Sequence, residues 1–501
     1  MARRLDLRFS PLEILNALSR REPDLYAVVR MQSTIGRRAG YAGHMPSQIS
    51  ENAIEGMGVQ LYAPGGRSVL VASDVIDRPT LERLIAQAIA LLASHPEVPD
   101  GLDTGAFKGY SPIRARRFHA GRDVVADLSL AEFAREVERA HEYFYTLADD
   151  TCRTMATNAL AFDEQWRIFR SDGTDVYFQT IRTTLSHQVT LTRDGRTTTV
   201  RDAESGCDDT LLTDPASLDR MRRRIHRKMV LGLQTLSAEP VPAGHYNIIL
   251  DAGMAKGLAH EAFGHACESD RVMEGSALTR DGTYLRGERI APPSVSVVDC
   301  ALEGDWADQP FSANGFPRQR VAIIDRGILT NALGDIFSGP AAGLESTGAE
   351  RVERYDRPPL PRMSNIRLEV ADAIPWDRDF ALVEADELYR FLLDRGVIRL
   401  DEEWLFLEGY RGGQVNSMSG DYVFNCSVIH RLRDGEVHVH PPAIFSGRVL
   451  ETLNAIRAAV GPLEIHRQGT CGKDGQRVPS SGGGHLFTLF NACEGISIGG
   501  R

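Results

Sequence analysis

The pattern of apolar residues changes at Pro240-Val241-Pro242, and this change constrains the fold more than any other part of the sequence. Before it, helix-like and strand-like segments alternate along the chain. After it, short strand-like runs are separated by many Gly-Gly and Asp-Gly pairs, and long helical patterns are few. The sequence therefore predicts an α+β protein with a mixed α/β domain at residues 1–239 and a β-rich domain at residues 240–501.

Periodic segments are clear in the N-terminal part. Residues 58–62 and 68–72 read as two strands joined by a turn at Pro64-Gly65-Gly66. Apolar residues at i, i+3 and i+4 over residues 81–92 predict a helix that begins at Pro79. We expect two further helices, over residues 130–143 and after Asp214-Pro215, and a hairpin over residues 166–180.

Composition and charge exclude several classes of protein. The 57 basic and 68 acidic side chains give a net charge of −11, whereas a nucleic-acid binder needs a basic surface. No segment reaches the roughly 18 apolar residues of a membrane-spanning helix. The seven cysteines are odd in number and scattered, unlike a disulfide framework. We expect a cytoplasmic protein with reduced thiols and with neither nucleic acid nor membrane as a partner.

A possible metal motif follows the short apolar run at residues 246–250. Asp251 is a good N-cap, and residues 252–268 read as a helix containing His260-Glu261-Ala262-Phe263-Gly264-His265. In the familiar H-E-x-x-H motif, histidines at i and i+4 share one helix face and the glutamate lies beside the metal-bound water. Here the spacing is H-E-x-x-x-H. The motif alone is equally well explained by a helix with one buried, hydrogen-bonded histidine and an exposed glutamate.

The i, i+5 spacing requires a distorted helix if both histidines bind one ion. At about 100° per residue, the two imidazoles of a regular α-helix would point about 140° apart. A single π-turn winds more slowly and would bring them together, and π-bulges are frequent at functional sites. Gly264, which weakens regular helix, lies where this distortion is needed.

A cysteine near the C-terminus supplies a third candidate ligand. Cys471 stands among glycines and close to Lys473, so it could approach a metal and be held as a thiolate. Two histidine nitrogens and one thiolate, with the fourth position open, form a known type of catalytic zinc site. The alternative is a buried cysteine in a turn-rich hairpin.

These residues resemble the TldD/PmbA family of metallopeptidases, and the similarity covers most of the chain. The TldD-type subunit of that family carries H-E-x-x-x-H and the late cysteine, whereas the PmbA-type (TldE) subunit lacks both, so this sequence is similar to the catalytic subunit. The shared motifs are His260-Glu-Ala-Phe-Gly-His265 with Glu268 and Asp270, Pro-Arg-Met-Ser-Asn at 361–365, Gly-Tyr-Arg-Gly-Gly-Gln-Val at 409–415, Gly-Asp-Tyr-Val-Phe at 420–424, Cys-Gly-Lys-Asp-Gly-Gln at 471–476 and Val478-Pro479.

The resemblance implies that His260, His265 and Cys471 hold Zn²⁺ and that Glu261 is the general base. Zinc would lower the pKa of its bound water, and Glu261 would carry the proton to the leaving amine. Because a thiolate donates more electron density than imidazole, slow and selective processing is expected. Glu268 would either orient a ligand histidine or be a plain exposed acid.

The resemblance also implies a substrate class and a partner. Family members process extended or unfolded peptides, including precursors of peptide-derived natural products, inside a cavity formed with a second subunit. Peptide capture there resembles strand addition. A TldE/PmbA-like partner would give a heterodimer, and a homodimer would serve equally well. After Val478-Pro479 the chain departs from the family pattern, and His485 there would be either an oxyanion stabiliser or an ordinary loop histidine.

Three functions remain open from the sequence. The first is a zinc-dependent peptidase. The second is a non-catalytic scaffold or regulator, as the family's historical label of DNA gyrase modulator suggests. The third is a hydrolase that uses Cys471 as a nucleophile and a histidine as the base. Chelators would abolish the activity of the first and leave that of the third, and the second would have none.

Overall fold

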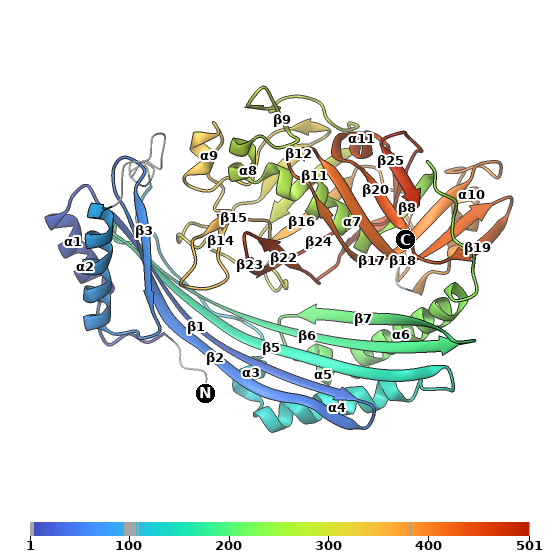
Figure 1. The fold of residues 1–501 in the computed structure, drawn as a ribbon, viewed down its shortest axis with the longest axis horizontal. Coiled ribbons are helices and arrows are strands. Elements are labelled where there is room, and N and C mark those ends of the chain that lie inside the picture. Colours follow the sequence, from blue (N-terminus) through green and yellow to red (C-terminus); the bar gives the residue numbers. More distant parts are fainter. Residues whose placement is uncertain (1–4, 95–106, 108–109, 380–381, 500–501) are drawn as a thin grey trace.

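The computed structural model describes residues 5–94, 107, 110–379 and 382–499, and two large sheets organise them (Figure 1). The first sheet has the order β3-β2-β1-β5-β6-β4, with β7 also paired to β6. Its strands are β1 (Tyr26–Ala42), β2 (Met45–Tyr62), β3 (Ser68–Ser73), β4 (Arg114–Arg117), β5 (Cys152–Arg170), β6 (Asp175–Arg193) and β7 (Arg196–Gly206). The accompanying helices are α1 (Pro11–Arg21), α2 (Arg78–Ser94), α3 (Val124–Asp127), α4 (Leu130–Tyr145), α5 (Thr210–Thr213) and α6 (Pro215–Thr235).

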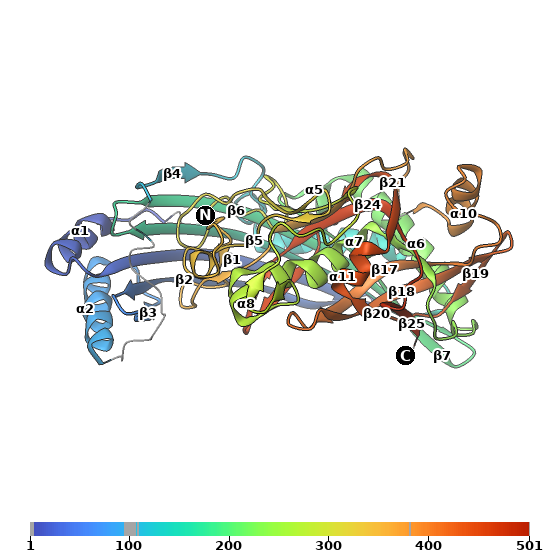
Figure 2. The ribbon, with the colours of Figure 1, turned by 90° about the horizontal axis from the view of Figure 1, so that it is seen from above.

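Four strands of this sheet, β1, β2, β5 and β6, are 17 to 19 residues long and curve beneath the C-terminal half (Figure 1). Seen from above, they run along most of the molecule (Figure 2). The expected helices are confirmed as α2, α4 and α6. Ser129 and Glu132 form a capping box at the start of α4, and Asp214 caps α6. The expected β2–β3 and β5–β6 pairs are also present.

The second sheet is mixed and has twelve strands among the described residues. Its main order is β13-β12-β11-β16-β24-β8-β17-β18-β20-β25, with β19 on β18 and β21 on β24. The strands are β8 (Asn247–Asp251), β11 (Val295–Cys300), β12 (Val321–Asp325), β13 (Ile328–Leu329), β16 (Asn365–Val370), β17 (Trp404–Val415), β18 (Asp421–Arg433), β19 (Glu436–His440), β20 (Ile444–Arg448), β21 (Ile456–Ile465), β24 (Ser481–Phe490) and β25 (Ile496–Gly499). This arrangement confirms the α+β class.

Short elements complete the C-terminal half. They are the strand pairs β9 (Thr279–Arg280) with β10 (Thr283–Tyr284), β14 (Glu350–Arg351) with β15 (Leu360–Pro361) and β22 (Thr470–Lys473) with β23 (Gln476–Pro479), and the helices α7 (Ala252–Leu258), α8 (Ser269–Glu274), α9 (Ser338–Ala341), α10 (Ala385–Asp394) and α11 (Val449–Asn454). Strand β8 lies between β24 and β17 and leads directly into α7. Within the described ranges, no helix is both long and apolar enough to cross a membrane.

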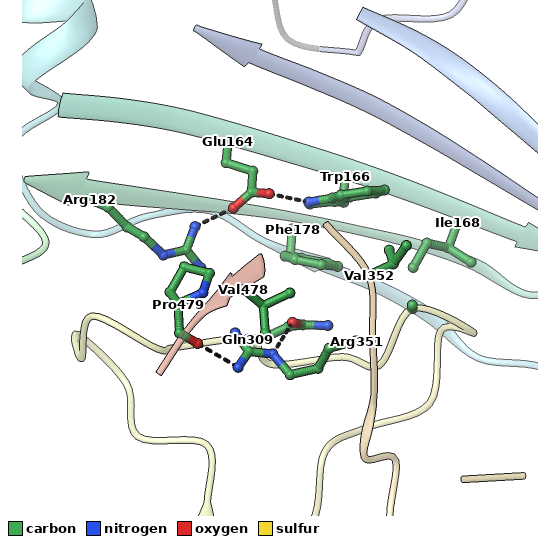
Figure 3. Close-up of a pocket in the computed structure, with 11 residues that line it drawn as sticks. Glu164, Trp166, Ile168, Phe178, Arg182, Gln309, Arg351, Val352, Val478 and Pro479 are labelled. Atoms are coloured by element: carbon green, nitrogen blue, oxygen red, sulfur yellow. Dashed lines mark hydrogen bonds and ion pairs between the residues drawn. The ribbon is translucent and has the colours of Figure 1, made fainter. Parts of the chain in front are cut away.

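Buried arginines of the first sheet hold loops of the C-terminal half. Arg30 of β1 donates to the carbonyl of Ala313 at 2.7 Å, and Arg182 of β6 donates to the carbonyl of Trp306 at 2.8 Å. Arg182 of β6 and Val478 and Pro479 of β23 line one cavity of about 20 Å³ (Figure 3). The first sheet and the β22–β23 hairpin therefore adjoin at this cavity. The domain boundary at residues 239/240 stays a prediction.

Candidate metal centre

The two histidines lie on a helical segment that changes its winding between them. Asp251 ends β8 and accepts a hydrogen bond from the N–H of Met254 at 2.7 Å, which starts α7. Residues Ala259–Gly264 are π-helical, and a 3₁₀ turn follows at His265–Cys267. The expected π-turn is thus present, and the two imidazole centroids lie 5.2 Å apart.

Gly264 is required by packing as well as by helix geometry. A Cβ at this position would lie 1.7 Å from Sδ of Met363, which is fully buried just before β16. The absence of a side chain lets the π-helical turn lie directly against this methionine. Weak helix propensity, which the sequence indicates for Gly264, is thus joined by a steric requirement that depends on Met363.

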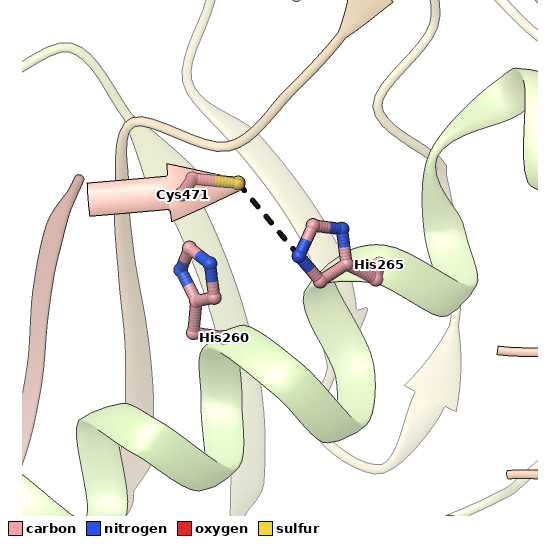
Figure 4. A group of neighbouring side chains, drawn as sticks. All are labelled: His260, His265 and Cys471. Carbon is pink, nitrogen blue, oxygen red and sulfur yellow. Dashed lines mark hydrogen bonds between the residues drawn. The ribbon is translucent and has the colours of Figure 1, made fainter. Parts of the chain in front are cut away.

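Cys471 reaches the histidines from the β22–β23 hairpin. A tight turn at Asp474 and Gly475, both with positive φ, connects the two strands. The Sγ of Cys471 lies 3.7 Å from Nε2 of His265, and the ligand atoms of His260, His265 and Cys471 are all within 4.8 Å of one another (Figure 4). Cys471 is indeed a buried cysteine in a hairpin, as the alternative expected. In addition, this hairpin places its Sγ close to both imidazoles.

The three side chains fit a zinc ion by their chemistry. The buried imidazole of His260 makes no hydrogen bond within the described part of the chain, and its Nδ1 is enclosed. Burial, together with the charges of His265 and Lys256, holds the pKa of His260 well below its usual range, so the ring stays neutral. Imidazole nitrogens and a cysteine thiolate are ligands that zinc prefers.

The two glutamates near the site have different surroundings. One Oε of Glu261 lies 3.9 Å from Nε2 of His265, and burial raises the pKa of this carboxyl. Glu268 is fully buried and accepts from Nδ1 of His265 at 3.0 Å. Burial alone would raise the pKa of Glu268, but Lys473 and His265 lower it to about 2. The alternative of an exposed acid at Glu268 is therefore wrong.

His485 lies outside this group of side chains. It belongs to β24, not to a loop, and its Nδ1 contacts the carbonyl of Gly461 at 2.8 Å. Its Nε2 accepts from the N–H of Val370 at 3.1 Å. Both ring nitrogens are thus engaged by main-chain groups, which excludes the oxyanion role considered from the sequence.

Sequence reasoning missed three buried donors around Cys471. Arg362 donates to the carbonyl of Cys471, and Trp306 donates to the carbonyl of Gly469 at 2.8 Å. Lys256, one turn before His260, donates to the carbonyl of Gln468. The available signal was a single lysine in a helix otherwise made of small and apolar residues.

Known proteins similar to this chain in sequence are metalloproteases by name, in agreement with the H-E-x-x-x-H and cysteine motifs. Residues 243–481 match the family model of the PmbA/TldA metallopeptidase C-terminal domain. Over these residues the chain is similar to the metallopeptidases of that family. A relative from Methanothermobacter thermautotrophicus, named metalloprotease, is 30% identical over 279 residues, which are 56% of each chain. One from Saccharolobus solfataricus, named zinc metalloprotease TldD homolog, is 27% identical over 50% of this chain and 52% of its own. The chain spans about half the length of the curated relatives it matches.

Solved structures show that the fold extends over nearly the whole chain. A Thermotoga maritima protein described as a candidate modulator of DNA gyrase gives a TM-score of 0.72 at 17% identity, over 97% of this chain and 98% of its own. TldE from Thermococcus kodakarensis gives 0.71 at 14% identity, over 98% and 100%. Because both identities are low, these likenesses concern the fold alone.

Proposed function

We propose that this chain is a zinc-dependent peptidase that cleaves extended or unfolded peptides, with His260, His265 and Cys471 as the zinc ligands. The observation that carries the proposal is the convergence of these three side chains, from two segments about 200 residues apart, within 4.8 Å. The metallopeptidase family model and the metalloprotease names of the relatives support the same reaction class.

The roles of the other residues follow from their positions. A bound zinc supplies Lewis acidity at the scissile carbonyl and activates a water molecule. Glu261 accepts the proton of the attacking water and gives it to the leaving amine nitrogen as the C–N bond breaks; its burial-raised pKa suits this transfer. Glu268 holds Nδ1–H of His265 and so directs Nε2 toward Cys471.

The substrate and the partner belong to the same proposal. We infer that the substrate is a peptide in extended conformation, such as a precursor of a peptide-derived natural product, held in a cavity between two subunits. The likeness of the fold to TldE supports a TldE/PmbA-like partner, and a homodimer remains the alternative. The seven free thiols suit a reducing, cytoplasmic compartment.

A cysteine-nucleophile hydrolase is the second candidate, because Sγ of Cys471 lies 3.7 Å from Nε2 of His265. The two candidates differ in their response to metal removal. Incubation with 1,10-phenanthroline followed by desalting abolishes activity in the zinc peptidase, and added Zn²⁺ restores it. A cysteine hydrolase keeps its activity through the same treatment.

The deciding experiment is the metal content of purified wild-type protein beside Cys471→Ser, measured by plasma mass spectrometry. We expect about one zinc per wild-type chain and a strongly reduced amount in the variant. Cys493→Ser is the matched control, because this half-buried cysteine lies after β24, outside the three-ligand group. Equal zinc in all three proteins would remove Cys471 from the site. No metal in any of them, without prior chelation, would favour the scaffold.

A further inference from the structure

The segment before Cys471 is held by its main-chain carbonyls. We call residues 467–470 the ligand loop, because this loop leads into β22 and Cys471. The carbonyl of Gly469 accepts from Trp306 Nε1 at 2.8 Å and from the N–H of Ser480 at 3.0 Å. The carbonyl of Gln468 accepts from the ammonium of Lys256. Of these donors, Lys256 is the one that belongs to the helical segment carrying the two histidines.

Lys256 is an unusual residue for its position. Its side chain is buried, and α7 around it consists of alanine, glycine, methionine and leucine. A buried ammonium is costly unless it is hydrogen-bonded or paired. Burial lowers the pKa of Lys256 to about 8 against the opposing charge of Glu261, so the side chain is still mostly protonated at neutral pH. The ammonium of Lys256 is therefore a buried charge that donates a hydrogen bond to the ligand loop.

The contact between the helix and the ligand loop depends on Gly469. A Cβ at this position would lie 2.4 Å from Nζ of Lys256 and 2.9 Å from the carbonyl oxygen of Ser480. The φ of Gly469 is +150°, which residues with a side chain rarely adopt. Only glycine lets the ammonium approach the loop this closely.

We propose that Lys256 is a positioning residue of the metal centre: it fixes the ligand loop against the helix so that Cys471 stays within reach of His260 and His265. This inference rests on the proposed function, since it assumes that the three side chains bind a metal. Lys256 acts on the chain before Cys471, whereas Lys473 is bound to Glu268 on the chain after it. With both contacts, the thiol is fixed from two sides relative to the helix. Without Lys256, the contact between the helix and the chain before Cys471 is lost, and the contact of Lys473 with Glu268 remains.

The test compares Lys256→Met, Lys256→Arg and wild type in the metal-free, full-length protein. Zinc affinity is measured by competition with a chromophoric chelator, and Co²⁺ is added to record the thiolate-to-cobalt charge-transfer band. We expect Lys256→Met to bind both metals roughly 10–100-fold more weakly, with a weaker band. Lys256→Arg, which keeps the charge and the donor, should recover most of the affinity. Lys228→Met is the matched control, because Lys228 pairs with Asp202 in the first sheet.

Each result has a definite meaning. A wild-type protein that binds no metal overturns the proposed function itself. A wild type that binds metal while Lys256→Met binds equally well, with an unchanged band, overturns the inference and leaves the proposed function intact. A loss that Lys256→Arg does not recover at all assigns the effect to packing and also overturns it. If circular dichroism shows that Lys256→Met is unfolded, Gly469→Ala takes its place, because its Cβ displaces the ammonium; unchanged affinity there counts against the inference.

Discussion

Glu268 and Lys473 form a buried ion pair, with 2.9 Å between Oε2 and Nζ. The same carboxylate oxygen accepts from Nδ1 of His265, whose Nε2 faces Sγ of Cys471. Because Lys473 lies two residues after Cys471 on β22, these contacts close a ring that joins the histidine helix to the cysteine strand. Asp270 also binds the ammonium, at 2.7 Å. The ring of contacts orients His265 toward Cys471.

Replacing Glu268 by Gln should therefore weaken metal binding without removing a ligand. The neutral amide cannot balance the charge of Lys473 and is a poorer acceptor for Nδ1–H of His265. We expect zinc affinity to fall about 10–100-fold. Equilibrium competition with a chelator measures this, and Glu274→Gln on α8, which is more than half exposed, is the control. Wild-type affinity in Glu268→Gln would show that the ring has no effect on the site.

Glu261→Gln tests the proposed general base. The substitution is nearly isosteric and leaves His260, His265 and Cys471 in place, so zinc content should stay at the wild-type level. Cleavage of an unstructured peptide should slow by roughly 10²–10⁴-fold, because an amide cannot accept the proton of the attacking water. Peptide cleavage is followed by mass spectrometry and metal content in the same sample. Normal cleavage with normal zinc would assign the base to another residue.

A double-mutant cycle tests the steric reason for Gly264. Gly264→Ala should destabilise the protein and lower its zinc content, because the new Cβ overlaps Sδ of Met363. Met363→Ala creates a cavity in a fully buried position and should cost about 2–5 kcal/mol. In the double variant the two changes compensate, so its loss of stability should be smaller than the sum of the single losses. Strict additivity in urea unfolding would mean that Met363 is not the obstacle.

Stability at low pH should depend on Glu408. This half-buried carboxylate of β17 pairs with Arg227 of α6 and contacts Nε2 of His430 at 2.9 Å. Burial alone would raise its pKa, but the hydrogen bond from His430 and the charge of Arg227 lower it from the ordinary 4.5 to about 2. The ionised form therefore stabilises the folded state above about pH 4.5, and this stabilisation is lost as the pH falls through 2.

Unfolding by urea at several pH values measures this effect. The difference between 4.5 and 2 corresponds to about 3 kcal/mol, so wild type should exceed Glu408→Gln by an amount of this order at pH 7. The difference should shrink steadily between pH 4.5 and pH 2. Glu403→Gln is the control, because its pair with Arg431 is about 30% exposed and such pairs contribute about 0–1 kcal/mol. A difference independent of pH would contradict the assignment.

The local geometry of the metal centre was more predictable than the sheets. The i, i+5 spacing of His260 and His265 required a π-turn, because a regular helix would separate the rings, and the turn is present. In contrast, the expected strand at residues 58–62 is only the buried end of β2. The outer part of β2, from Met45, is mostly exposed and has no apolar alternation. Pairing with β1 keeps it extended, and such long-range pairing leaves no local sequence pattern.

Contacts between segments that are distant in the chain could not be predicted from the sequence either. Glu268 could be either exposed or bound to His265, because its environment depends on β22, about 200 residues later. His485 was expected in a loop after a run of glycines, yet Gly482–Gly484 form the start of β24, where backbones approach closely. In both cases the deciding neighbour is remote along the chain, and one sequence contains no record of it.

His265 and Cys471 are 206 positions apart in the chain. Translation must therefore continue 206 residues past His265, and β22 must pack in place, before the thiol can approach the two imidazoles. Until then the growing chain contains the two histidines of the group and lacks the cysteine. If the site cleaves unfolded chains, this late assembly keeps each nascent copy from attacking itself or its neighbours on the same messenger.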